Sequence, residues 1–115
     1  MQMPIQITSR QFEITPPIRN SINEKAEKLD RFHDHIISCR VTIDKPHKHK
    51  HKGRLYNLLI DLTVPGKEIV VKNEPHDDLY VSIRDAFEVA KRRLIEYEAK
   101  RRSEYKQKDE FLLPV

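Results

Sequence analysis

The feature that most constrains the fold is a regular apolar stripe within residues 79–102. Its members recur at spacings of three and four residues: Leu79, Ile83, Ala86, Phe87, Ala90, Leu94 and Tyr97. At about 100° per residue, this spacing places all of them on one face of an α-helix. Asp77 and Asp78 precede the stripe as capping residues, and residues 100–102 follow it with the positive charge that a helix end favours. The segment therefore predicts a long helix that is buried on one side.

Alternation of apolar and polar residues predicts four strands elsewhere in the chain. We expect them at about residues 4–10, 36–44, 54–64 and 67–72. The inward set of the second strand is Ile37, Cys39, Val41 and Ile43, and that of the third is Tyr56, Leu58, Ile60, Leu62 and Val64. Pro65 and Gly66 predict a tight turn between the last two strands. Because polar residues fill the other side, the sheet is expected to be covered on a single face.

A shorter helix is predicted after Thr15, its cap, with Pro16 and Pro17 in a first turn where missing amide donors do little harm. Its apolar face consists of Ile18, Ile22, Ala26, Leu29 and Phe32. Two amphipathic helices and one half-buried sheet bury each other's apolar surfaces if both helices pack on the same sheet face. The predicted fold is therefore an α/β two-layer sandwich of order βαβββα, with a four-stranded sheet and two helices on one face.

The chain of 115 residues is long enough for one small domain. We assign that domain to residues 1–103 and expect a flexible tail over residues 104–115. No run of about 18 apolar residues is present, and residues 1–10 lack the apolar stretch of a signal peptide, so a cytoplasmic location is expected. The single cysteine, Cys39, fits a reducing compartment and is interpreted as a small buried residue of a strand.

Positive charge is concentrated locally, although the net charge is only +4. Residues 45–54 contain five Lys or Arg and no acid, and the second helix adds a basic row beside its apolar stripe. Localised positive charge attracts polyanions, so RNA, DNA and an anionic membrane surface are the candidate partners. If the two helices lie side by side, their facing flanks form one electropositive strip of Lys25, Lys28, Arg84, Lys91 and Arg92. Such a strip suits the phosphates of an RNA backbone.

The basic segment 45–54 also holds three alternating histidines, His47, His49 and His51. Three interpretations stay open: a transition-metal site, a solvated basic loop, and a contact with RNA phosphate. Neighbouring lysines and the lack of an acid or cysteine disfavour the metal, so no metal or other cofactor is expected. The preferred RNA contact uses the cations Lys48, Lys50, Lys52 and Arg54. Protonation of the histidines below about pH 6.5 should then tighten RNA binding.

Several stretches, taken in order, resemble a known family. They are ITSRQFEITPPIR, EKLDRF, CRVTID, GRLYNLLIDLTVPGKEIVV and HDDLYVSIRDAFEVAKRRL. Over about residues 5–102 the chain resembles the short form of the ribosome hibernation-promoting factor and ribosome-associated translation inhibitor family. The resemblance implies a βαβββα domain that binds rRNA of the small ribosomal subunit in the channel used by transfer and messenger RNA. It also implies that binding blocks translation under stress or in stationary phase.

The resemblance further implies that Lys25, Lys28 and Arg92 contact rRNA, because family members commonly have Lys or Arg at these places. Arg84 and Lys91 join them from the helical periodicity alone. Arg31 completes the candidate RNA-binding residues of the two helices. The expected partner is the small ribosomal subunit, without a membrane or a small-molecule substrate, and the chain is expected to be a monomer when it is not bound.

Three other classes of function compete with ribosome binding. An enzyme is disfavoured because the sequence has no Ser/His/Asp set and no glycine-rich phosphate loop. Two non-enzymatic alternatives stay open. The first is a general double-stranded RNA-binding module, which also contains a helix, three strands and a helix. The second is a regulatory protein-interaction domain that docks through a sheet edge or through the apolar residues 111–113.

Overall fold

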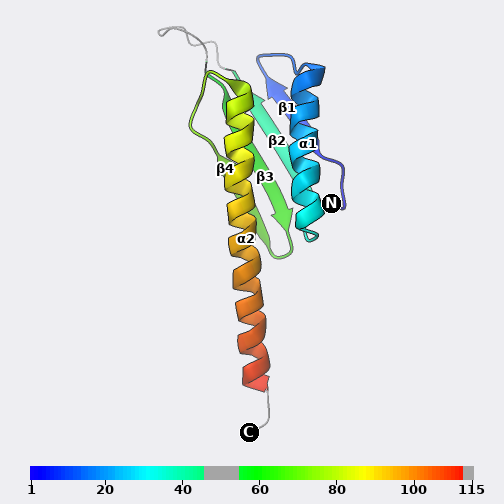
Figure 1. Cartoon of the computed structure of the whole chain (residues 1–115), viewed down its shortest axis with the longest axis vertical. Helices are drawn as coiled ribbons and strands as arrows, with labels where there is room; N and C mark the ends of the chain where they lie inside the picture. Colours follow the sequence, from blue (N-terminus) through cyan, green and yellow to red (C-terminus); the bar gives the residue numbers. More distant parts are fainter. Residues whose placement is uncertain (46–54, 113–115) are drawn as a thin grey trace.

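The structure is a computed structural model that describes residues 1–45 and 55–112. The elements in this part of the chain are β1 (Gln6–Arg10), α1 (Pro16–Phe32), β2 (Ser38–Asp44), β3 (Asn57–Val64), β4 (Lys67–Lys72) and α2 (Leu79–Leu112). The strands form one four-stranded sheet, and both helices lie on the same face of it (Figure 1). The predicted two-layer sandwich of order βαβββα is therefore confirmed.

The sheet has the strand order β1-β2-β3-β4 and contains both parallel and antiparallel pairs. β1 runs parallel to β2, with Ile7 opposite Val41, because α1 carries the chain back across one face before β2 begins. The other two pairs are antiparallel. Gly66 makes the tight turn between β3 and β4 at a φ of 75°, a conformation that strains residues with a side chain. This topology leaves β1 and β4 as the two edges of the sheet.

The hydrophobic core lies between the sheet and the two helices. The sheet contributes the inward residues Cys39, Val41, Ile43, Leu58, Ile60, Leu62, Val64, Ile69 and Val71. The predicted stripe of α2 is buried from Leu79 to Leu94, and Tyr97 packs against its end. α1 adds Ile22, Ala26 and Leu29 to the same core. Burying each large side chain contributes about 1.5–3 kcal/mol, so the shared core holds both helices and fixes how their flanks face each other.

The start of α1 agrees with the sequence in position but not in its capping chemistry. Thr15 is the N-cap residue, yet within the described residues its side chain makes no capping hydrogen bond. Pro16 and Pro17 have already removed two of the amide donors that a cap would satisfy, so such a bond would contribute little. Thr15 is therefore the N-cap residue, as predicted, but it caps without a side-chain hydrogen bond.

The end of α1 also differs from the prediction. Phe32 was expected on the buried face, but it is 70% exposed, whereas His33 is only 7% exposed. The helix ends at Phe32, and the backbone N–H of His33 still donates to the Leu29 carbonyl at 2.9 Å. His33 therefore takes the inward position that lies four residues after Leu29, and Phe32 is turned to the flank of the helix.

β1, β2 and β3 each begin two or three residues later than the alternation indicated, whereas β4 has the predicted bounds. Ile36, just before β2, is buried while Ile37 is partly exposed, so the predicted inward position of Ile37 is wrong. Tyr56 forms an isolated antiparallel bridge with His76 instead of belonging to β3. These differences arise where strands leave the sheet and tertiary contacts replace the regular alternation.

α2 continues past Arg102 to Leu112. The sequence between these two residues has no glycine or proline that would stop a helix. α2 therefore projects beyond the end of the sheet, where Figure 1 shows it as a single extended rod. The division into a domain over residues 1–103 and a flexible tail over residues 104–115 stays a prediction.

Candidate nucleic-acid interface

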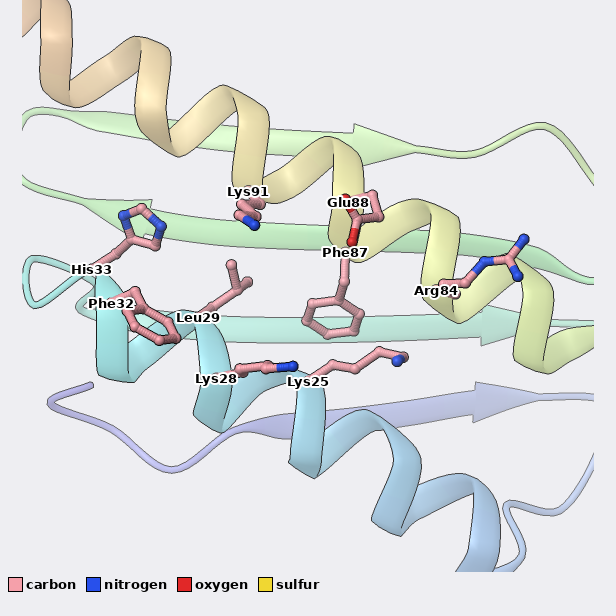
Figure 2. Close-up of a pocket in the computed structure, with 9 residues that line it drawn as sticks. All are labelled: Lys25, Lys28, Leu29, Phe32, His33, Arg84, Phe87, Glu88 and Lys91. Carbon is pink, nitrogen blue, oxygen red and sulfur yellow. The ribbon is translucent and has the colours of Figure 1, made fainter.

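A groove of about 170 Å³ lies between α1 and α2 on the helical face of the molecule (Figure 2). Its lining residues are Lys25, Lys28, Leu29, Phe32, His33, Arg84, Phe87, Glu88 and Lys91. Leu29 and Phe87 belong to the core and are almost fully buried, so they form an apolar floor. Cationic side chains lie along both sides. We call this site the interhelical groove.

Helical periodicity explains why both sides of the interhelical groove are basic. Lys25 and Lys28 lie one turn apart on the flank of α1 beside its buried stripe. Arg84 and Lys91 lie two turns apart on the facing flank of α2. The structure therefore brings together four of the five cations that the sequence analysis placed in one strip. Figure 2 shows them on the facing sides of α1 and α2.

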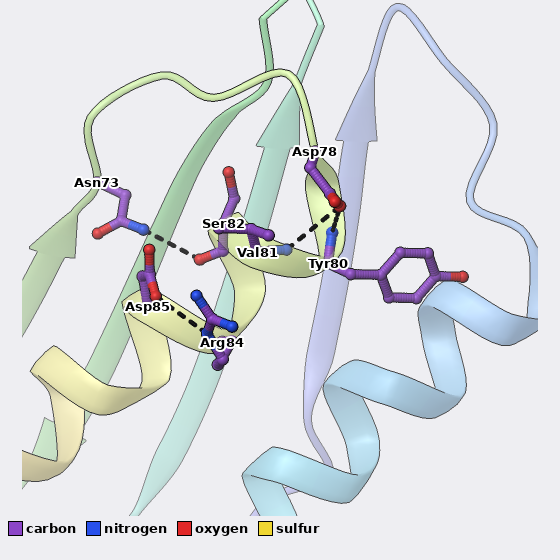
Figure 3. Close-up of polar contacts among 7 residues, drawn as sticks. All are labelled: Asn73, Asp78, Tyr80, Val81, Ser82, Arg84 and Asp85. Atoms are coloured by element: carbon purple, nitrogen blue, oxygen red, sulfur yellow. Dashed lines mark hydrogen bonds and ion pairs between the residues drawn. The ribbon is translucent and has the colours of Figure 1, made fainter.

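Polar contacts define the start of α2 (Figure 3). The Asp78 carboxylate accepts hydrogen bonds from the backbone N–H groups of Tyr80 at 3.0 Å and Val81 at 3.4 Å. The Asn73 side-chain amide donates to the Ser82 carbonyl at 3.0 Å and joins the preceding connection to the first turn. The predicted aspartate cap is therefore confirmed at Asp78. The cap fixes where α2 begins, and the buried stripe then sets which flank of the helix faces α1.

Arg92 and Arg31 lie outside the interhelical groove. Both are exposed, and neither occurs among the described residues that line the groove. One residue corresponds to about 100° of helix rotation, so Arg92 is turned away from Lys91 toward the outer side of α2. The expectation that Arg92 shares the strip with the other four cations is corrected accordingly. A contact of Arg92 or Arg31 with RNA stays a prediction.

The remaining predicted RNA contacts, Lys48, Lys50, Lys52 and Arg54, lie outside the described residues together with His47, His49 and His51. The residues on either side of this segment are described. Lys45 Nζ lies 3.0 Å from the Tyr56 hydroxyl and 4.6 Å from the centre of its ring. Phe12 packs edge-on against the same ring, with 5.6 Å between the ring centroids. A hydrogen bond and a cation–π contact thus join Lys45 and Tyr56, which lie on either side of residues 46–54 in the sequence.

Positive charge dominates the interhelical groove. Glu88 is the one carboxylate among its described lining residues, against four Lys or Arg. Arg84 also donates from Nε to Asp85 at 3.2 Å (Figure 3), but these side chains are 62% and 52% exposed. Water screens such an exposed pair strongly, so an anionic ligand can compete with it. The arrangement therefore favours binding of a polyanion over binding of a cation.

One contact that the sequence analysis missed lies at an end of the interhelical groove. His33 Nδ1 is 2.8 Å from Glu98 Oε1, and the two side chains are 9% and 22% exposed. A hydrogen bond between these atoms ties the end of α1 to α2. The sequence does contain a sign that His33 is buried, because His33 lies four residues after Leu29 and continues the buried stripe of α1.

Cys39 has the environment of a structural residue. It is 1% exposed on β2, as the sequence predicted. Burial raises the pKa of the Cys39 thiol from 9.0 to about 12, with a further contribution from the negative charge of Asp61. A thiol with such a pKa stays protonated at neutral pH and is a poor nucleophile.

Across residues 1–45 and 55–112, no group of three or more His, Cys, Asp or Glu is placed to hold a metal. Over the same residues, no helix combines the length and apolarity needed to cross a membrane.

Comparison with known proteins identifies the family. A family model described as "Sigma 54 modulation protein / S30EA ribosomal protein" matches residues 5–102. The chain belongs to this family. The matched residues include all four strands, α1 and the part of α2 that packs on the sheet. The S30EA family match thus covers both sides of the interhelical groove.

Relatives in the S30EA family carry the names of ribosome hibernation factors. The "Ribosome hibernation promotion factor" of Deinococcus radiodurans is 33% identical over 95 residues, which make up 83% of this chain and 49% of that protein. The "Ribosome hibernation promoting factor" of Acidithiobacillus ferridurans is 34% identical over 70% of this chain and 99% of that protein. The factor of the same name from Azotobacter vinelandii is 31% identical over 85% of each. The chain therefore spans about half the length of the first relative and most of the other two.

Two solved structures have the same fold as this S30EA-family chain. A ribosomal subunit interface protein from Coxiella burnetii superposes with a TM-score of 0.71 at 21% identity, over 84% of this chain and 99% of that one. The N-terminal domain of Protein Y from Thermus thermophilus superposes with a TM-score of 0.67 at 26% identity, over 83% and 99%. Both similarities extend across the sheet and the two helices that form the interhelical groove.

Proposed function

We propose that this protein is a ribosome hibernation factor that acts in the cytoplasm. It binds rRNA of the small ribosomal subunit in the channel for transfer and messenger RNA, and it blocks translation under stress or in stationary phase. The observation that carries the proposal is the interhelical groove, where Lys25, Lys28, Arg84 and Lys91 surround one opening. The names of the relatives support the ribosome as the partner.

Binding is mainly electrostatic. Each phosphate of an RNA backbone carries a negative charge, and the groove presents cations one and two helical turns apart that can contact several phosphates together. Neutralising phosphates releases bound counterions, so the affinity falls steeply as the salt concentration rises. The apolar floor belongs to the core and keeps both helices in place. Binding therefore costs little conformational entropy of the backbone.

Inhibition of translation requires no chemical step. The bound domain occupies space that transfer and messenger RNA need, and translation resumes when the domain dissociates. The protein acts as a monomer, without a cofactor or a small-molecule substrate. Because the contacts are mainly to phosphates, this mode of binding is readily reversible.

A charge reversal in the interhelical groove tests the proposal. Lys28→Glu combined with Lys91→Glu replaces one cation on each side of the groove by an anion. We expect co-sedimentation with small ribosomal subunits to fall by about 100-fold and inhibition of in vitro translation to be relieved. Both side chains are exposed, so thermal unfolding should be unchanged.

A matched pair of substitutions on β4 separates the site from the net charge. Lys67→Glu combined with Lys72→Glu makes the same change in charge on exposed residues at the sheet edge, outside the groove. We expect this control to bind ribosomes within about threefold of the wild type. A groove variant that inhibits translation at the wild-type concentration would refute the proposed site. Equal losses of ribosome affinity from the groove pair and from the β4 pair would mean that the overall charge alone determines binding.

A further inference from the structure

We propose that Phe32 is a stacking platform for an unpaired base of the RNA in the interhelical groove, an inference that rests on the proposed function. Phe32 is 70% exposed, whereas the other exposed large apolar residues in the described part of the chain range from 42% to 49%. Figure 2 shows its ring at the edge of the groove, at the end of α1. A flat apolar surface is thus presented to solvent inside a cationic site.

The position of the ring carries the argument, because single exposed apolar side chains are common on protein surfaces. Phe32 lies one helical turn after Lys28 and two turns after Lys25 on the same flank of α1. All three side chains line the interhelical groove. An aromatic face next to a row of cations is complementary to a nucleotide, since the cations attract the phosphate and the ring can stack on the base.

Contacts around the end of α1 hold the platform in place. The backbone N–H of His33 donates to the Leu29 carbonyl at 2.9 Å, and the His33 side chain reaches Glu98 on α2 at 2.8 Å. The residue next to Phe32 is therefore fixed by both helices, and this sets the direction in which the ring leaves α1. A platform that is ordered before binding loses less conformational entropy when a base stacks on it.

The partner chemistry that fits this platform is single-stranded RNA. In a duplex the faces of each base are covered by neighbouring bases, so a side chain cannot stack on them. A loop, a bulge or a strand end exposes a base face that can reach Phe32 while its phosphates contact Lys25 and Lys28. The groove therefore selects unpaired rRNA, a selectivity that phosphate contacts alone do not provide.

The experiment uses the full chain, a single-stranded RNA oligonucleotide of mixed sequence, and a duplex of the same length. Phe32→Leu keeps an apolar side chain but removes the ring, and we expect it to weaken single-strand binding by about tenfold. Phe32→Tyr keeps the ring and should bind with wild-type affinity. Tyr80→Leu is the matched control, because Tyr80 is a 49% exposed aromatic residue outside the groove, and it should also bind like the wild type.

A fluorescence measurement reports stacking directly. The chain contains no tryptophan, so Phe32→Trp introduces a single indole at the groove. We expect the single-stranded oligonucleotide to quench the indole emission at saturation and the duplex to leave it nearly unchanged. Thermal unfolding of each variant should match the wild type, because the replaced side chain is exposed.

Two results would overturn the inference. One is wild-type affinity of Phe32→Leu for the single strand, and the other is an equal loss of affinity for the single strand and the duplex. Either result leaves the proposed function intact if Lys28→Glu combined with Lys91→Glu still prevents ribosome binding. Failure of the proposed function has a different signature, because that charge-reversal variant would then bind ribosomes normally.

Discussion

The two flanks of α2 carry cations of the same kind but place them in different surroundings. On the groove flank, which faces α1, Arg84 and Lys91 border an opening to solvent. On the hairpin flank, which faces β3 and β4, the Arg93 guanidinium donates to the Val70 carbonyl. A basic residue beside a buried stripe can therefore serve either a ligand or the fold, and its neighbours decide which.

The hairpin flank continues at Tyr97. The Tyr97 hydroxyl donates to the Pro65 carbonyl at 2.6 Å and accepts from Arg101 at 2.7 Å. The Arg101 guanidinium also lies 5.8 Å from the centre of the Tyr97 ring. These contacts connect α2 to the turn between β3 and β4. Arg93 and Arg101 are therefore engaged in contacts within the domain, whereas Arg84 and Lys91 line the opening of the groove.

Charge reversal on one flank at a time tests this difference most severely. Arg84→Glu combined with Lys91→Glu should lower the affinity for small ribosomal subunits by about 100-fold. Arg93→Glu combined with Arg101→Glu makes the same change in charge and should instead lower the free energy of unfolding by about 2 kcal/mol. Co-sedimentation and urea unfolding measure the two effects. Equal losses of affinity from both flanks would remove the distinction between them.

A single truncation refines the result for the groove flank. Lys91→Ala should weaken binding by about tenfold and reduce the slope of log affinity against log salt by about 0.7, the value for one phosphate contact to a single strand. Titrations of ribosome binding at several salt concentrations measure the slope. Arg93→Ala provides the comparison and should leave it unchanged. An unaltered slope for Lys91→Ala would mean that Lys91 contacts no phosphate.

The corresponding truncation on the hairpin flank should affect stability. Arg93→Ala removes the donor to the Val70 carbonyl and the packing of the long side chain, so we expect the free energy of unfolding to fall by about 1 kcal/mol. Urea unfolding followed by circular dichroism measures this change. Arg92→Ala is the matched control, because that side chain is exposed, and its effect on stability should stay within about 0.5 kcal/mol.

The smallest expected effect concerns one hydroxyl group. Tyr97→Phe keeps the ring but removes the donor to Pro65 and the acceptor for Arg101. We expect the free energy of unfolding to fall by about 0.5–1 kcal/mol, with no change in ribosome affinity. Thermal unfolding and co-sedimentation measure the two quantities. A loss of affinity without a loss of stability would place Tyr97 in the binding surface.

Long regular patterns made much of the fold predictable from the sequence. The stripe of α2 repeats over five turns, so a single irregular residue does not obscure which face is buried. The alternation in β4, with Ile69 and Val71 inward between two lysines, gave its bounds correctly. β1 shows the same alternation, with exposed and half-buried residues in turn, and it pairs in parallel with β2 after the chain returns through α1.

The ends of elements were less predictable because they depend on contacts from distant parts of the chain. The choice between Phe32 and His33 for the inward position depends on where α1 stops and on Glu98, which lies on α2. Helical periodicity identified the groove cations correctly because their flanks adjoin the buried stripes. It misplaced Arg92, because the helix turns by about 100° between Lys91 and Arg92, from the groove to the outer side of α2.

Arg93 also affects the open edge of the sheet, since β4 pairs with β3 on one side only. The backbone N–H of Asn73 donates to the Leu58 carbonyl at 3.2 Å, and bonded and non-bonded pairs alternate along an antiparallel ladder. By this alternation, the N–H and C=O groups of Val70 point away from β3. A strand from a second molecule would need this carbonyl to extend the sheet. Strand addition at Val70 must therefore first displace the Arg93 guanidinium.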